Sequence, residues 1–149
     1  MTFLKKQSFG FYASLVVCVL AIISVALYSA NASGAYYNDS NSLVVFLTVM
    51  GIVLVALSLV LAQIADKSYA LEKLCDLVRV AIPCFIIAAC LVFLSARVYS
   101  YGIIFFSDLE AGNAAAMEAA TQSVTAVVFY VITAVLSAVT AFFAIKKAD

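Results

Sequence analysis

The chain has 149 residues, of which 67% are hydrophobic and only 11% are charged, and its mean hydropathy is +1.19. Soluble domains are close to half apolar and a quarter charged, so this composition excludes an ordinary soluble domain and predicts an integral membrane protein. The formal net charge is zero and histidine is absent, which excludes imidazole metal ligands, histidine-ligated haem and histidine general bases.

Four long apolar segments follow one another along the chain. A helix of about 20 residues spans about 30 Å, the thickness of the hydrocarbon core. Because backbone groups find no water there, each segment is expected to be helical. The segments are residues 9–28, 43–64, 80–101 and 124–145. We therefore predict an all-α membrane protein, a single domain in which four transmembrane helices form one bundle.

The first segment also has features of a signal peptide. Lys5 and Lys6 precede the apolar run, and the small-residue sequence Ala-Asn-Ala follows it at 30–32. A signal peptide has an apolar region of roughly 7 to 15 residues, and this run is longer, which favours a transmembrane helix.

Residues 65–80, between the second and third segments, show a helical pattern. One side is apolar and the other is charged. The apolar side comprises Leu71, Leu74, Cys75 and Val78, and the charged side comprises Glu72, Lys73, Asp76 and Arg79. Pro83 lacks a backbone donor and disfavours helix at the residue before it. We expect a short amphipathic interfacial helix followed by a bend; the alternative is an extension of the third transmembrane helix.

The connection between the third and fourth segments also has local signals. Gly102 is expected to end the third helix, and Asn113 is a good N-cap for the alanine-rich stretch that follows. The fourth helix is therefore expected to start near Ala114, before its apolar segment begins.

Basic residues are distributed unevenly. Seven of the eight Lys and Arg residues lie at the two chain ends or between the second and third segments, and none lies in the other two connections. This asymmetry predicts that both termini face the cytoplasm. The composition, rich in Ala and Val with lysine-flanked termini, favours a bacterial inner membrane.

The remaining basic residue, Arg97, lies inside the third segment. A guanidinium in hydrocarbon needs a partner, a route to water or a function. If the helix ends at Gly102, Arg97 is near the outer interface, where it snorkels or pairs with acids of the following loop. If the helix continues through Phe106, Arg97 lies deeper and is a candidate ligand or partner site. The candidate site comprises Arg97, Asp108, Glu110 and Glu118.

Small and hydroxylated residues recur at helical spacing in the fourth segment, including Thr133, Ser137 and Thr140. Such a stripe forms either a packed helix–helix seam or the lining of a polar pathway. No catalytic motif is recognised, and no cofactor, metal or nucleic acid is expected. We expect a non-enzymatic structural or accessory subunit that binds itself or another membrane protein within the lipid bilayer. The alternative is a small-solute transporter or channel subunit that works as an oligomer.

Overall fold

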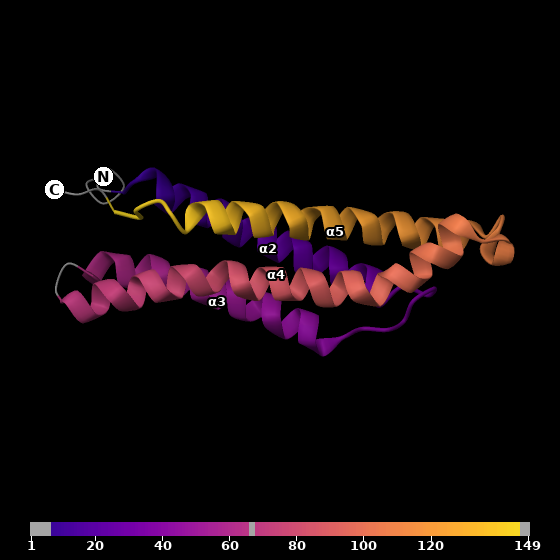
Figure 1. The fold of residues 1–149 in the computed structure, drawn as a ribbon, viewed down its shortest axis with the longest axis horizontal. Helices are drawn as coiled ribbons and strands as arrows, with labels where there is room; N and C mark the ends of the chain where they lie inside the picture. The colour runs from indigo at the N-terminus through magenta and orange to yellow at the C-terminus, as the bar shows by residue number, and fades with distance from the viewer. Residues whose placement is uncertain (1–6, 66–67, 147–149) are drawn as a thin grey trace.

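The computed structural model describes residues 7–65 and 68–146. They form four long helices and one short 3-10 helix, and all four long helices are long and apolar enough to cross a membrane. The elements are α2 (Phe9–Ala32), α3 (Ser42–Ile64), α4 (Tyr69–Phe106), η2 (Asp108–Glu110) and α5 (Ala114–Thr140) (Figure 1). The predicted all-α four-helix bundle is confirmed. Four basic residues used to predict orientation, Lys5, Lys6, Lys67 and Lys147, lie outside the described residues.

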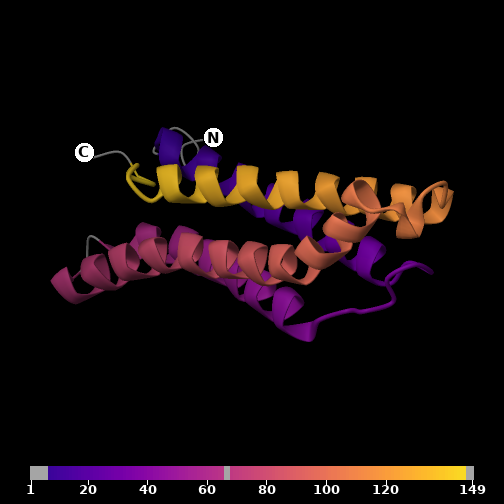
Figure 2. The ribbon, with the colours of Figure 1, turned by 45° about the vertical axis from the view of Figure 1, so that its right-hand side comes forward.

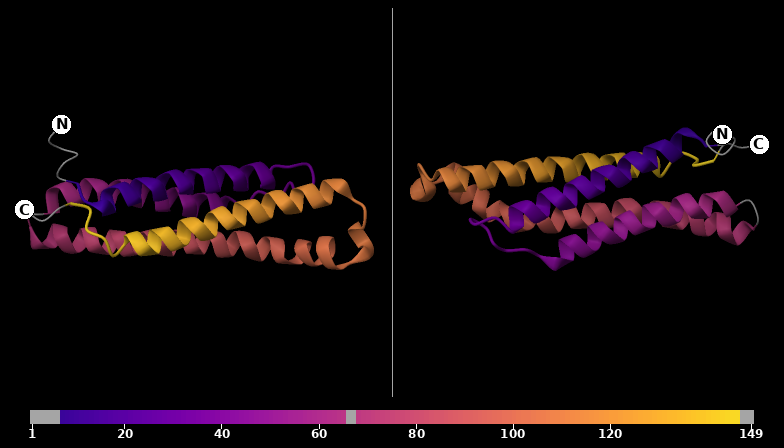
Figure 3. Two further views of the ribbon diagram at one scale, coloured as in Figure 1. Left: turned by 90° about the horizontal axis from the view of Figure 1, so that it is seen from above. Right: turned by 180° about the vertical axis from the view of Figure 1, so that it is seen from behind.

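Consecutive helices run antiparallel and form a ring, in which α2 packs against α3 and α5, and α4 packs against the same two helices (Figure 2). Both ends of the described chain lie at one end of the bundle, together with the end of α3 and the start of α4 (Figure 1); we call this the terminal end. The opposite end, the hairpin end, carries the α2–α3 loop and the α4–α5 connection. There the tip of the α4–α5 hairpin extends beyond the α2–α3 loop (Figure 3).

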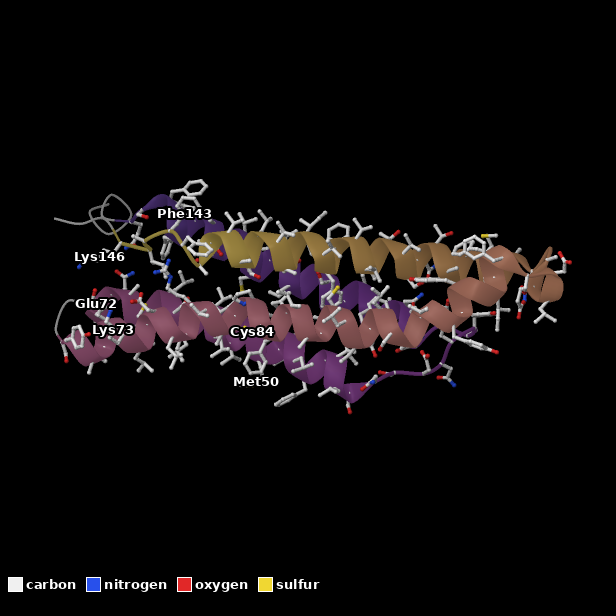
Figure 4. The ribbon with its side chains drawn as sticks, viewed as in Figure 1. Met50, Glu72, Lys73, Cys84, Phe143 and Lys146 are labelled. Carbon is white, nitrogen blue, oxygen red and sulfur yellow. The ribbon has the colours of Figure 1, made fainter. Side chains whose placement is uncertain are left out.

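Small residues fill much of the bundle interior, while larger apolar residues point outward. Ala21, Ser24 and Ala126 are fully buried, whereas Val60 and Val128 are 62% and 48% exposed. Exposed branched apolar side chains along every long helix suit a hydrocarbon solvent, and small buried residues let helices approach closely. The charged side chains Glu72, Lys73 and Lys146 lie at the terminal end (Figure 4).

The interfacial helix expected between the second and third segments is not present as a separate element. Its residues form the first turns of α4, which continues through Pro83 as one helix of 38 residues. The physical reason is packing: Cys75 and Val78 are buried against Leu61 and Ala62 of α3. These contacts hold the first turns of α4 on the bundle, and the alternative of an extended third helix is correct.

The expected helix end at Gly102 is also wrong. Helix α4 runs to Phe106, and Ser107 caps it. Ile104 is buried with Ala116 and Ala120 of α5, so packing between the two helices stabilises the additional turn. The predicted N-cap Asn113 is confirmed, because its side-chain oxygen accepts a hydrogen bond from the backbone N–H of Ala116 at 3.2 Å.

Helix α5 ends at Thr140, five residues before the predicted boundary at residue 145. The guanidinium of Arg79 donates hydrogen bonds to the carbonyl oxygens of Thr140 and Phe143. The backbone N–H of Ser8 donates to the carbonyl oxygen of Ile145 at 3.0 Å. Since a cation at a helix C-terminus satisfies its free carbonyls, these contacts explain why the chain leaves the helix at this point.

Candidate functional site

The site is built around Arg97 of α4, whose side chain is buried at the hairpin end. Only 1% of Arg97 is exposed. Its two terminal nitrogens donate to the two carboxylate oxygens of Asp39 at 2.6 and 2.8 Å. Its Nε donates to Oδ1 of Asn31 at 3.3 Å. The paired geometry with Asp39 is the planar bidentate arrangement that suits a guanidinium and a carboxylate.

Aromatic rings lie over the guanidinium. The Cζ atom of Arg97 is 3.8 Å from the centre of the Tyr37 ring and 5.5 Å from the centre of the Phe93 ring. The negative faces of these rings attract a cation. Phe93 in turn makes an edge contact with Tyr28, with the ring centres 4.9 Å apart. Arg97 therefore has a charged partner on one side and aromatic partners around it.

The α2–α3 loop, residues 33–41, presents Asp39 to Arg97. Asn38 has a φ of +42°, a left-handed conformation that asparagine tolerates better than most residues. The next backbone N–H, that of Asp39, donates to the carbonyl oxygen of Ala32 at 3.0 Å and folds the loop back onto the end of α2. The Tyr28 hydroxyl accepts a hydrogen bond from the backbone N–H of Asn41 at 2.7 Å, which fixes the other end of the loop.

Asn31 connects the site to the fourth helix. Its amide nitrogen donates to the carbonyl oxygen of Ala119 in α5 at 2.9 Å, while its amide oxygen accepts from Arg97. One buried amide thus joins α2, α4 and α5, and Asp39 adds the α2–α3 loop. Arg97 lies level with the end of α2, because it bonds to Asn31 in the last turn of that helix.

The expected partners of Arg97 were wrong. Asp108, Glu110 and Glu118 do not pair with it in the structure; Asp39 of the other loop does. Asp108 and Glu110 lie in η2, where Glu110 accepts a hydrogen bond from the Asn113 amide at 2.6 Å. Glu118 accepts from Gln122, one turn later in α5, at 3.2 Å. The sequence signal that was missed is Asp39, the single acid in the α2–α3 loop.

Ionisation in the α2–α3 loop follows from these contacts. The hydrogen bonds and positive charge of Arg97 lower the pKa of Asp39 below its ordinary value of 3.8, although partial burial acts in the opposite direction. Desolvation and the neighbouring Glu110 carboxylate raise the pKa of Tyr36 above its ordinary value of 10.0. At neutral pH the loop therefore carries an ionised Asp39 and a neutral Tyr36.

The hydroxyl stripe of the fourth segment forms a packed seam. Thr133 and Ser137 are 0% and 1% exposed, and Thr140 is half-buried. The Thr133 hydroxyl lies 3.2 Å from that of Ser24 in α2. Ser137 and Thr140 donate to carbonyl oxygens of their own helix. A second pair, Thr48 and Tyr130, joins α3 to α5 with 2.8 Å between the hydroxyl oxygens.

Comparison of the chain with protein-family models, with curated proteins and with solved structures gives no match. The class of protein is therefore defined by the fold and the site alone: a multi-pass four-helix membrane protein with an arginine–aspartate pair at one end of its bundle.

Proposed function

We propose that the protein is a non-enzymatic structural or accessory subunit that associates with itself or with another membrane protein. The observation that supports this most is that buried polar groups along the bundle are paired with one another. Thr133 meets Ser24, Thr48 meets Tyr130, and Arg97 meets Asp39. Groups used in this way hold helices in register and are not available to coordinate a passing solute.

The same pairs weigh against the alternative of a solute pathway through the centre of a single bundle. A pathway needs polar groups that face a hydrated space, whereas Thr133 and Ser137 are buried in helix contacts. The short connections between helices leave little room for a separate binding domain. A partner protein is therefore expected to bind to helix faces and to the hairpin end.

Association within the bilayer gives the direct test. If the protein associates with itself, copies labelled with donor and acceptor dyes should show energy transfer in liposomes that persists as the lipid-to-protein ratio rises. If it needs another membrane protein, energy transfer should appear only after that co-purifying protein is restored. The same liposomes should not take up solutes above the level of empty vesicles. Selective uptake of a solute would contradict the proposal and support the transporter alternative.

We further propose that both termini face the cytoplasm, because seven of the eight basic residues lie at the chain ends or between the second and third apolar segments, whereas the other two connections carry only acidic charges. In a chain whose native cysteines are replaced with alanine, Glu110→Cys should react with an impermeant maleimide added to intact cells. Lys73→Cys should react only after permeabilisation. The opposite labelling pattern would reverse the orientation.

A further inference from the structure

An open cavity lined by both polar and apolar residues lies beside the arginine site, between the α2–α3 loop and the first turns of α5. Its volume is about 220 Å³, and its lining includes Asn31, Tyr36, Tyr37, Glu118 and Gln122. Pockets for drug-sized ligands are typically about 300 Å³ or larger, so this cavity suits one small organic group.

The charge around this cavity is negative and uncompensated. Within the described part of the chain, Asp108, Glu110 and Glu118 form no ion pair with a basic side chain. Among the described residues Arg97 is the single basic residue at this end, and Asp39 already binds it through both carboxylate oxygens. Glu118 lines the cavity, and its described partner is the neutral amide of Gln122. The cavity therefore favours a positively charged occupant.

Two tyrosines supply a second feature that favours a cation. The rings of Tyr36 and Tyr37 are nearly perpendicular, at 83°, with their centres 5.0 Å apart. The neighbouring Glu110 carboxylate, which helps to raise the pKa of Tyr36, adds negative charge beside that ring. Tyrosine faces attract organic cations, and cages of such rings recognise substituted ammonium groups.

Tyr37 also has an unused polar atom. Its hydroxyl oxygen is buried and, alone among such side-chain atoms in the described residues, has no hydrogen-bond partner. Buried hydroxyls are normally paired, so this orphan indicates a site whose partner set is incomplete.

We propose that this cavity binds an organic ammonium group, supplied either by a soluble amine or by the ethanolamine headgroup of a membrane lipid. Glu118 provides the counter-charge, and Tyr36 and Tyr37 provide aromatic walls. A divalent metal ion is a poorer fit, because Ca²⁺ needs about six to eight oxygen ligands and the cavity offers one carboxylate among amide and phenol groups. An anion is disfavoured by Glu118 in the lining and by the Glu110 carboxylate beside Tyr36.

The test uses the full chain, isotopically labelled, in nanodiscs of phosphatidylglycerol. Ethylammonium chloride is titrated while the backbone amide signals of Gly34 and Gln122, which both line the cavity, are followed by NMR. Sodium chloride of equal ionic strength is the reference. We expect saturable shifts with ethylammonium and none with sodium. The proposal would be overturned if the shifts do not saturate when ethylammonium, at millimolar concentration, is in 100-fold excess over the protein. An equal response to sodium would overturn it as well.

Matched variants distinguish a defined binding site from general attraction by the negative charge at this end of the bundle. Glu118→Gln should raise the apparent Kd about fivefold or more, whereas Asp108→Asn, which removes a charge at the same end outside the cavity lining, should change it less than twofold. Tyr36→Leu should weaken binding more than Tyr36→Phe, which keeps the ring. Equal effects of Glu118→Gln and Asp108→Asn would reduce the site to general electrostatic attraction and contradict the proposal.

The source of the ammonium group is decided by changing the lipid. In nanodiscs that contain phosphatidylethanolamine, a lipid headgroup in the cavity should shift the Gly34 and Gln122 signals before any amine is added and weaken the response to ethylammonium. An unchanged starting spectrum and an unchanged titration assign the cavity to a soluble amine. Either result supports binding of an ammonium group, provided that the Glu118→Gln effect is present.

Discussion

Replacing Asp39 with alanine should destabilise the protein by about 3 kcal/mol or more, because it leaves a buried guanidinium without its counter-charge. Arg97→Met should destabilise it less, by about 1 to 2 kcal/mol. The reason for the difference is exposure: the side chain of Arg97 is 2% exposed and that of Asp39 is 44% exposed, so an orphaned Asp39 can turn to water. Methionine also keeps much of the packing against Tyr37 and Phe93. Reversible unfolding in mixed micelles, followed by circular dichroism, measures both values.

The pH dependence provides the control for this prediction. Because pairing lowers the pKa of Asp39 in the folded protein, its contribution is fully present above the ordinary value of 3.8 and is lost as the pH falls through the lower folded value. The stability difference between the parent protein and Asp39→Asn should therefore shrink only below about pH 4. A difference that is constant through this range, or equal effects of Asp39→Ala and Arg97→Met at pH 7, would show that the pair does not hold the loop.

The second large effect is expected at Gly10, where α2 passes close to the chain after α5. A Cβ atom there would overlap the carbonyl group of Ala144 and lie 2.8 Å from the carbonyl oxygen of Phe143. Both neighbours are backbone atoms, which cannot rotate away as a side chain can. Gly10→Ala should therefore destabilise the bundle by about 1 to 3 kcal/mol, measured by the same unfolding assay.

Two other glycines serve as controls for Gly10→Ala. A Cβ at Gly102 would have no neighbour within 4 Å, so Gly102→Ala should be neutral or should stabilise α4 by up to about 1 kcal/mol. At Gly51 the nearest atom is Cδ1 of Ile86, at 2.7 Å, which belongs to a flexible side chain, so an intermediate effect is expected. A Gly10→Ala effect no larger than that of Gly102→Ala would mean that the start of α2 is not in close contact with the chain after α5.

The features that could be predicted from the sequence are those set by local composition. Apolar length alone identifies four membrane-spanning helices, and the Asn113 cap is predicted because its side chain bonds within the next turn. Tertiary packing overrode the remaining local signals. Pro83 and Gly102 both favour a helix boundary, yet α4 passes through both because Cys75 packs on α3 and Ile104 packs on α5.

The partner of Arg97 could not be derived from the sequence for a related reason. Loop acids on either side of α4 have the right charge, and the nearer ones in sequence, Asp108 and Glu110, are the more obvious choice. Which acid pairs with Arg97 depends on the left-handed turn at Asn38, which returns Asp39 to the end of α2. It also depends on Asn31 of α2, which bonds to Arg97 in α4. Neither feature follows the periodic spacing of apolar residues from which helices and their faces are predicted.

The ring order of the helices has a consequence for assembly as the chain is synthesised. Asn31, Asp39 and Arg97 all precede α5, so the arginine–aspartate pair can form within a three-helix intermediate. The contacts of α2 with α5, including Asn31 with Ala119 and Ser24 with Thr133, join the first and last helices and must wait until the fourth helix has entered the membrane. Until then Ser24 and the amide nitrogen of Asn31 lack their partners in α5. The pair at Arg97 can thus hold the first three helices together while the place for the last remains open.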